Sequence, residues 1–356
     1  MSLVDEVRAL RSSAGLSRAS HVAVVHVEGP DAIDLLQHAC TQAPYLREGR
    51  ARHTLLLRHD GGVFADAYVA AFDDGYVVLA EGPDEGDLVS WLEALKTRDS
   101  GDRKAEIRGQ SAEWVVFGVD GPFAWEVVTG LLGPGVLGMP YLTLLRRDDV
   151  LCVRGGKTGE YGYLLVVPRT SASEVEKKIV TIGRPIDLAP VQHEALDVCA
   201  LENAHFSIRT LRASPIASSL TPIELQLQWR VAYARQFVGA AALRARRGEG
   251  ANVRATCVAA SGPIAPGQPV QIAGHDAGAL LAACFSPTLG QWIGSALLDI
   301  HLAHPHLTLT AATEGGQVSL ETRSAPLVAN LSLRIDPHKH TYATRDAVAT
   351  TLEPAR

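Results

Sequence analysis

A double-glycine turn followed by an alternating segment constrains the fold of this chain more than any other feature. Residues 60–62 read Asp-Gly-Gly, apolar side chains alternate through residues 63–69, and a second apolar run covers residues 76–79. Two such runs joined by the turn-forming residues 73–75 predict a β-hairpin. Asp66 stands within the first run, although aspartate is depleted from strands. Its carboxylate should therefore face either solvent or a pocket, and the pattern alone leaves both alternatives open.

The composition is that of an ordinary globular chain. With 356 residues, of which 47% are hydrophobic and 20% charged, it is long enough for two or three domains. A net charge of −6 and an isoelectric point near 6.1 argue against nucleic acid or an anionic membrane as partners, because either would need a concentrated basic surface. The amino terminus lacks a signal pattern and no run approaches the ~20 apolar residues of a membrane span, so we expect a cytoplasmic protein.

The remaining side chains with special chemistry give few leads. The five cysteines are scattered without the spacing of metal ligands, as expected of thiols in a reducing compartment, and no metal site is predicted. The one basic cluster, Arg244, Arg246 and Arg247, precedes Gly248, where a helix should end. It either interacts favourably with the helix dipole or docks an acidic carrier-protein partner.

Hydrophobic periodicity divides the chain into two regions. Helices are predicted over residues 31–39, 85–95 and 173–182, with short strands between them, so the first region mixes α and β structure. From about residue 252 short strands alternate with Gly and Pro, which predicts a small β-barrel or sandwich. The boundary should fall in the glycine-bearing segment 247–250, giving an amino-terminal region 1–247, with two subdomains, and a carboxy-terminal domain 251–345.

Several motifs follow one another in the order found in one known family. The chain resembles the glycine-cleavage T-proteins, the folate-dependent aminomethyltransferases of the GcvT-like superfamily. The matching segments are residues 14–24, 27–32, 60–69, 154–163, 195–202, 237–243 and 285–290. This resemblance implies an α+β fold in which two interleaved subdomains surround a central folate channel, with a β-barrel as the carboxy-terminal domain.

The resemblance also implies a catalytic group. Asp66 matches the functional aspartate of the family, and Ala65 takes the place of the acidic residue before it. In the family reaction N5 of tetrahydrofolate attacks a methylene carbon while an amine leaves, so a nearby carboxylate can orient the nucleophile and stabilise cationic charge. His53 matches a tyrosine that lines the family's site; it is either an acid/base partner of Asp66 or a hydrogen-bonded structural histidine.

The cofactor positions depart from the family. Leu164 and Leu196 stand where a glutamate and an arginine meet the polar edge of the pterin, and Ala80 matches a pocket asparagine. Because both charged partners are replaced together, a respecified, less polar pocket is a better explanation than decay. Tyr163 belongs to the matched motif beside Leu164. Glu160 is either a second candidate acid or closes its tight turn through backbone hydrogen bonds.

Three functions remain open at this stage. The first is a divergent aminomethyltransferase-like enzyme that acts on a small molecule through Asp66, with altered or lost dependence on tetrahydrofolate. The second is a genuine tetrahydrofolate-dependent aminomethyl or methyl transferase. The third is a non-catalytic folate-binding assembly factor, for which residues 235–240 lack the expected cysteine. Trp229 and Phe237 are expected to pack in the core near a domain junction.

Overall fold

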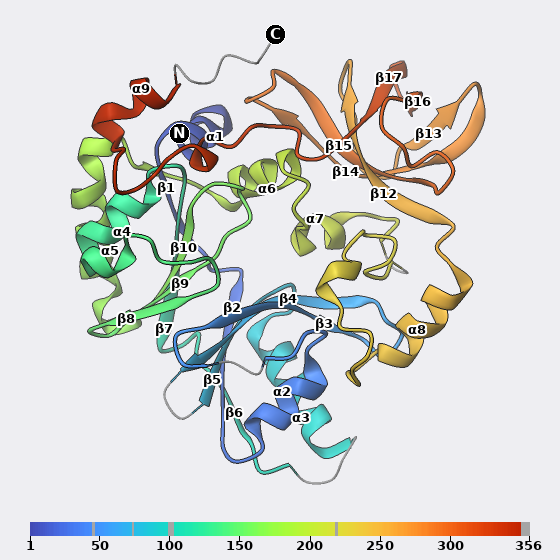
Figure 1. Ribbon diagram of the computed structural model, residues 1–356. Coiled ribbons are helices and arrows are strands. Elements are labelled where there is room, and N and C mark those ends of the chain that lie inside the picture. Colours follow the sequence, from blue (N-terminus) through green and yellow to red (C-terminus); the bar gives the residue numbers. More distant parts are fainter. Residues whose placement is uncertain (45–46, 73–74, 99–102, 218–219, 350–356) are drawn as a thin grey trace. The chain divides into compact units, whose positions relative to one another are not determined.

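The computed structural model describes residues 1–44, 47–72, 75–98, 103–217 and 220–349 (Figure 1). The chain forms two compact units, each built from stretches that are separated in sequence. Unit 1 comprises Met1–Ser20, Ala112–His205 and Val328–Arg356, and unit 2 comprises His21–Ser111 and Phe206–Leu327. Asp73 and Asp74, in the predicted hairpin turn, lie outside the described residues.

Unit 1 is a six-stranded sheet in the order β11-β1-β7-β10-β9-β8. Helices α4 and α5 pack against it and share its core (Figure 1). The elements of this unit are α1 (Leu3–Ser12), β1 (Gly15–Arg18), β7 (Trp114–Asp120), α4 (Ala124–Leu132), η1 (Pro134–Val136), β8 (Leu144–Arg147), β9 (Val150–Arg154), β10 (Gly162–Pro168), α5 (Arg169–Gly183), η2 (Arg184–Ile186), β11 (Ala189–Pro190), α6 (His193–Glu202), η4 (Leu331–Leu333), η5 (Tyr342–Thr344) and α9 (Arg345–Ala349).

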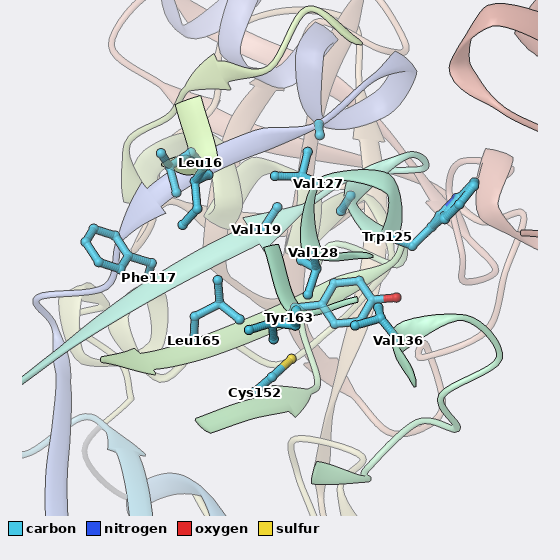
Figure 2. Packing of buried hydrophobic residues seen from close by; sticks show 14 of the residues in the cluster. Leu16, Phe117, Val119, Trp125, Val127, Val128, Val136, Cys152, Tyr163 and Leu165 are labelled. Carbon is cyan, nitrogen blue, oxygen red and sulfur yellow. The ribbon is translucent and has the colours of Figure 1, made fainter. Parts of the chain in front are cut away.

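Alternation along β10 decides which of its side chains enter this core. Tyr163 and Leu165 are buried with Val128 of α4, whereas Leu164 is only half-buried, since successive strand residues point to opposite faces (Figure 2). Full burial of an apolar side chain such as that of Leu165 stabilises the fold by roughly 1.5–3 kcal/mol. The apolar runs therefore fix the register of β10 in the sheet.

A buried arginine connects the three stretches of unit 1. Arg11 of α1 donates to Glu202 of α6 at 2.6 Å, to the carbonyl of Thr158 at 2.7 Å and to Asn330 at 3.1 Å. Its side chain is 10% exposed and that of Glu202 is fully buried. Such a charge is tolerated only because its donors are used by these acceptors.

Unit 2 contains a five-stranded sheet in the order β3-β4-β5-β2-β6. Its antiparallel β4 and β5 confirm the predicted hairpin, and the segment from Phe206 onward completes the unit. The elements up to the barrel are β2 (Val22–Glu28), α2 (Ala32–Ala39), β3 (Ala51–Leu57), β4 (Val63–Phe72), β5 (Gly75–Glu81), α3 (Glu85–Arg98), β6 (Glu106–Gly109), α7 (Ile208–Ala213), η3 (Gln228–Arg230) and α8 (Ala240–Glu249).

The two faces of this sheet are covered by different parts of the chain. Ala65 and Ala67 of β4 pack with Leu88 and Leu92 of α3 on one face, where Figure 1 shows α2 and α3. On the opposite face Leu55, Leu57 and Val63 pack with side chains from the segment 208–243. Because Asp66 lies between Ala65 and Ala67, its side chain points to this second face.

The carboxy-terminal strands form a closed barrel in the order β12-β15-β14-β13-β16-β17, which confirms the predicted β-rich region. Helix α8 ends at Glu249 and β12 begins at Val253, while the exact domain limits 1–247 and 251–345 stay a prediction. Within the described residues no helix is long and apolar enough to cross a membrane. The barrel strands are β12 (Val253–Ala260), β13 (Pro269–Ile272), β14 (His275–Ser286), β15 (Gln291–Asp299), β16 (Thr308–Thr313) and β17 (Gly316–Arg323).

Replacing Arg11 should destabilise unit 1 strongly. Arg11→Met removes the cation from a fully buried glutamate, so the free energy of unfolding should fall by roughly 3–5 kcal/mol in equilibrium urea unfolding. Arg18→Met is the matched control, because the Arg18–Glu176 pair is 59% and 30% exposed, and it should cost less than about 1 kcal/mol. Equal losses in the two variants would contradict a stabilising role for burial of the Arg11 network.

Candidate functional site

The predicted catalytic residues lie together on one face of the sheet of unit 2. His53 is directly opposite Tyr68 in the antiparallel pair β3–β4, and Leu55 is opposite Asp66. Residues 53 and 55, and residues 66 and 68, therefore point to the same side. The turn that sets this register is closed by Asp60, whose Oδ1 accepts from the amide of Gly62 at 2.9 Å, while Gly61 adopts φ +86°.

Asp66 is at the centre of a buried hydrogen-bonded group. Its Oδ1 accepts from Arg230 Nη2 and lies 2.7 Å from Nε2 of His53. The Asp66 side chain is fully buried, that of Arg230 is 3% exposed and that of His53 is 14% exposed. The sequence left open whether the Asp66 carboxylate faces solvent or a pocket. The structure excludes bulk solvent, and the positive charge of Arg230 offsets the cost of burying the carboxylate.

The histidine is fixed by a second contact. Its ring stacks on Tyr68 with centroids 4.3 Å apart and an interplanar angle of 15°. One edge of the imidazole is held by Asp66 and one face by Tyr68, so few ring orientations remain. His53 and Asp66 are brought together as the sequence suggested.

Arg230 is the member of the group that the sequence did not reveal. It lies in η3, 164 positions beyond Asp66, and also donates to the carbonyl of Thr54 at 3.1 Å. The local sequence signal was an arginine between two apolar residues, Leu227 and Val231. The structure shows that both of these neighbours are buried. The expectation for Trp229 is wrong, because its side chain is 72% exposed while the neighbouring arginine is buried; Phe237 is buried as expected.

The predicted cofactor residues are less uniform in their surroundings. Ala80 is opposite Ala67 and packs in the helix-covered core, on the other face of the sheet from Asp66. Tyr163 and Leu164 point to opposite faces of β10 in unit 1, and Tyr163 belongs to the core with α4. Leu196 is half-buried on α6. The role of these residues in a cofactor pocket stays a prediction.

Glu160 makes several hydrogen bonds within unit 1. Its carboxylate accepts from the amides of Leu331 at 3.1 Å and Ser332 at 2.8 Å and also from the Ser332 hydroxyl. Its Oε1 lies 3.6 Å from Arg11 Nη1. Burial raises the pKa of Glu160, and these hydrogen bonds together with Arg11 offset only part of that effect. The carboxylate therefore anchors the turn at residues 330–332.

The basic cluster near the end of α8 makes contacts within unit 2. Arg244 donates to the carbonyls of Tyr233 and Arg235, and Arg246 donates to Glu224 at 2.6 Å. Burial acts to raise the pKa of Glu224, but hydrogen bonds from Thr221 and Arg246 outweigh it and lower that pKa. Arg244 and Arg246 thus have structural contacts of their own.

Comparison with known proteins assigns the family. The model of the GCVT N-terminal domain matches residues 1–235, and that of the glycine cleavage T-protein C-terminal barrel domain matches residues 254–328. The chain belongs to the glycine-cleavage T-protein family. It is 25% identical over 336 residues to an aminomethyltransferase of Halothermothrix orenii, with 92% of each chain covered, and 29% identical over 314 residues to that of Streptomyces avermitilis, with 85% of this chain and 82% of the relative covered.

A solved structure shares the fold. The crystal structure of the glycine cleavage system aminomethyltransferase T from Bartonella henselae superposes with a TM-score of 0.81 at 21% identity, covering 92% of this chain and 89% of that one. The predicted α+β fold with a carboxy-terminal barrel is confirmed. The expectation of a transferase-like enzyme is confirmed at the level of the family.

The raised pKa of Glu160 predicts a pH effect on stability. A carboxyl group with a raised pKa binds its proton more tightly in the folded chain, so its contribution falls as the pH rises from the ordinary value of 4.5 through the folded-state value. The stability of the parent relative to Glu160→Gln, measured by urea unfolding, should therefore decrease with rising pH across this window. Glu176→Gln is the control of opposite sign, because a hydrogen bond from Arg18 lowers the pKa of Glu176.

Asp66 and Arg230 should contribute to stability as one unit. Asp66→Asn and Arg230→Met each leave one buried charge without its partner and should cost roughly 3–5 kcal/mol in urea unfolding. The double variant leaves neither charge and should cost clearly less than the sum of the two. Arg108→Met at the exposed Arg108–Glu28 pair should cost less than about 1 kcal/mol. Additive losses at Asp66 and Arg230 would show that the pair is not coupled.

Proposed function

We propose that this chain is an aminomethyltransferase-like enzyme that acts on a small molecule at a site centred on Asp66, with altered or lost dependence on tetrahydrofolate. The observation that carries the proposal is the buried group of Asp66, Arg230 and His53 on one face of β4. Burying two full charges is expensive, and a fold rarely needs it when apolar residues of similar size would do. Such groups are concentrated at functional sites.

The chemistry of the group suits transfer of a carbon between amines. Asp66 provides negative charge in a region from which water is largely excluded, where it can stabilise the cationic character that develops when a carbon–nitrogen bond breaks. The imidazole of His53 can accept or donate a proton near neutral pH. Membership of the aminomethyltransferase family supports this reaction class.

The residues at the predicted pterin positions do not fit the polar edge of a folate. Leu164 and Leu196 carry hydrocarbon side chains that offer no hydrogen bond, and both lie in unit 1. Charged hydrogen bonds contribute ~1.5–3 kcal/mol each, so loss of two would weaken folate binding by roughly 10²–10⁴-fold. No step of the proposed reaction is therefore assigned to folate.

A tetrahydrofolate-dependent one-carbon transferase is the second candidate. It is favoured by relatives named aminomethyltransferase that cover more than four-fifths of this chain. In that case polar contacts to the pterin would come from residues other than Leu164 and Leu196. This second candidate includes an acidic carrier-protein partner. Of the three clustered arginines of α8, Arg247 is exposed and would contact that partner.

Two measurements with the full chain test the proposal. With a simple amine supplied as the acceptor of the methylene carbon, ammonia release should be seen with some members of a panel of aminomethyl compounds, in which a methylene joins the amine to sulfur or nitrogen. This release should not require tetrahydrofolate. Asp66→Asn should lower this turnover by roughly 10²-fold or more, because it removes the negative charge. Calorimetric titration with tetrahydrofolate should give a dissociation constant well above the micromolar range.

The controls separate the candidates. Far-ultraviolet circular dichroism should show that Asp66→Asn is folded at the assay temperature, so that lost turnover is not lost protein. Sub-micromolar binding of tetrahydrofolate, with turnover that requires it, would overturn the folate-independent proposal in favour of the second candidate. Tight folate binding with no turnover on any compound would favour the non-catalytic assembly factor.

A further inference from the structure

Within the Asp66 group, the three side chains have unequal access and unequal freedom to titrate. Asp66 is fully buried and its Oδ1 accepts from both Arg230 and His53. A guanidinium does not give up its proton in proteins, so Oδ1 faces a permanent donor. The guanidinium charge beside Oδ1 favours the ionised form of the carboxyl group. Asp66 is therefore suited to remain a carboxylate rather than to exchange protons with a substrate.

The hydrogen bond to Asp66 also sets the tautomer of His53. A carboxylate oxygen only accepts, so Nε2 of His53 must carry the proton across the 2.7 Å contact. In the neutral imidazole the lone pair then lies on Nδ1. The His53 side chain is 14% exposed, against 0% for Asp66 and 3% for Arg230, so it is the most exposed member of the group.

We propose that His53 is the proton-exchanging group of this site, and that Arg230 is a positioning residue that holds Asp66 as the carboxylate that orients the imidazole. This role rests on the proposed function, because it needs a nitrogen nucleophile and a departing amine. The nucleophile loses its proton to Nδ1 as its lone pair forms the new bond to carbon. The old carbon–nitrogen bond breaks in the same displacement, so the carbon keeps four bonds. The departing nitrogen takes that electron pair and then the proton from Nδ1, and the imidazole is neutral again.

The charges around His53 determine the expected pH dependence. Titratable and charged groups on its side come from the neighbouring elements: Asp66 and Tyr68 of β4, Arg230 of η3, and the pair of Glu81 on β5 with Arg209 on α7. The positive charge of Arg230 offsets part of the negative charge of Asp66 at the ring. Removal of the Arg230 charge would leave the carboxylate alone beside the ring and favour the imidazolium, which cannot act as a base.

Nuclear magnetic resonance tests the arrangement without any substrate. In the full chain with ¹⁵N-labelled histidine, the signal that disappears in His53→Gln should report the Nε2–H tautomer near neutral pH. The ¹³Cγ signal of Asp66 should not titrate over the range in which His53 does. A Nδ1–H tautomer at His53, or protonation of Asp66 in that range, would overturn the proposal whatever the activity of the enzyme.

Kinetics tests the role of each residue on the aminomethyl compounds that the parent turns over. His53→Gln should lower kcat by roughly 10²-fold or more with little change in KM. Arg230→Met should move the acidic limb of the pH–kcat profile to higher pH. Arg230→Lys keeps the positive charge, so its acidic limb should lie where that of the parent does. It should also be more stable than Arg230→Met, because Asp66 keeps a cationic partner. Arg209→Met is the control. Arg209 pairs with Glu81 on β5, which is separated from the strand of His53 by β4, so its loss should move the acidic limb much less.

The outcomes separate this inference from the function on which it rests. Full turnover in His53→Gln with loss in Asp66→Asn would assign the proton to Asp66, overturning the inference while the proposed function stands. Loss of kcat in Arg230→Met with an unmoved acidic limb would reduce Arg230 to a structural role and also overturn it. Absence of turnover in the parent on every compound would overturn the proposed function, and the resonance measurement would still decide the protonation of the group.

Discussion

The contact between Asp66 and Arg230 is the interaction on which the proposed site of this protein depends. Both side chains are almost completely buried, so neither charge is tolerated without the other. Arg230 comes from the segment that covers one face of the sheet in unit 2, whereas Asp66 comes from the sheet itself. The covering segment therefore has to reach its place before the electrostatics of the site are complete. This ties formation of the site to folding of the whole unit.

Unit 1 relies on a related device for a different purpose. Arg11, on the first stretch of the unit, hydrogen-bonds to Glu202 on the second and to Asn330 on the third. Glu160 accepts hydrogen bonds from the backbone amides of residues 331 and 332. Here buried charge holds the carboxy-terminal segment to the unit, and no catalytic step needs to be invoked. The same residue types thus serve stability in one unit and, as proposed, chemistry in the other. The contrast lies in access, because His53 gives the Asp66 group a partly exposed member.

Local patterns predicted the elements well because they depend on neighbouring residues. The alternation at 63–69 became β4, the periodic run at 85–95 became most of α3, and the Gly- and Pro-punctuated strands became the barrel. The pairing of His53 with Asp66 could be anticipated because both lie on adjacent strands of one hairpin. Trp229 and Arg230 could not, since hydrophobicity predicts a buried tryptophan and an exposed arginine, and the structure has the reverse. The residues around Arg230 give no information about a counter-ion 164 positions away in the sequence.

By itself the sequence determined the order and type of the elements, the family, and the presence of an unusual aspartate in a strand, because periodicity, turn residues and ordered motifs are local properties. It also determined that hydrocarbon side chains stand at the predicted pterin positions. Only the tertiary structure decided that Asp66 is buried, that Arg230 neutralises it and that His53 is oriented by it. It also placed Glu160 on a backbone turn and Ala80 in the opposite core. Burial and charge compensation depend on which distant segments come together, and that information appears only when the chain has folded.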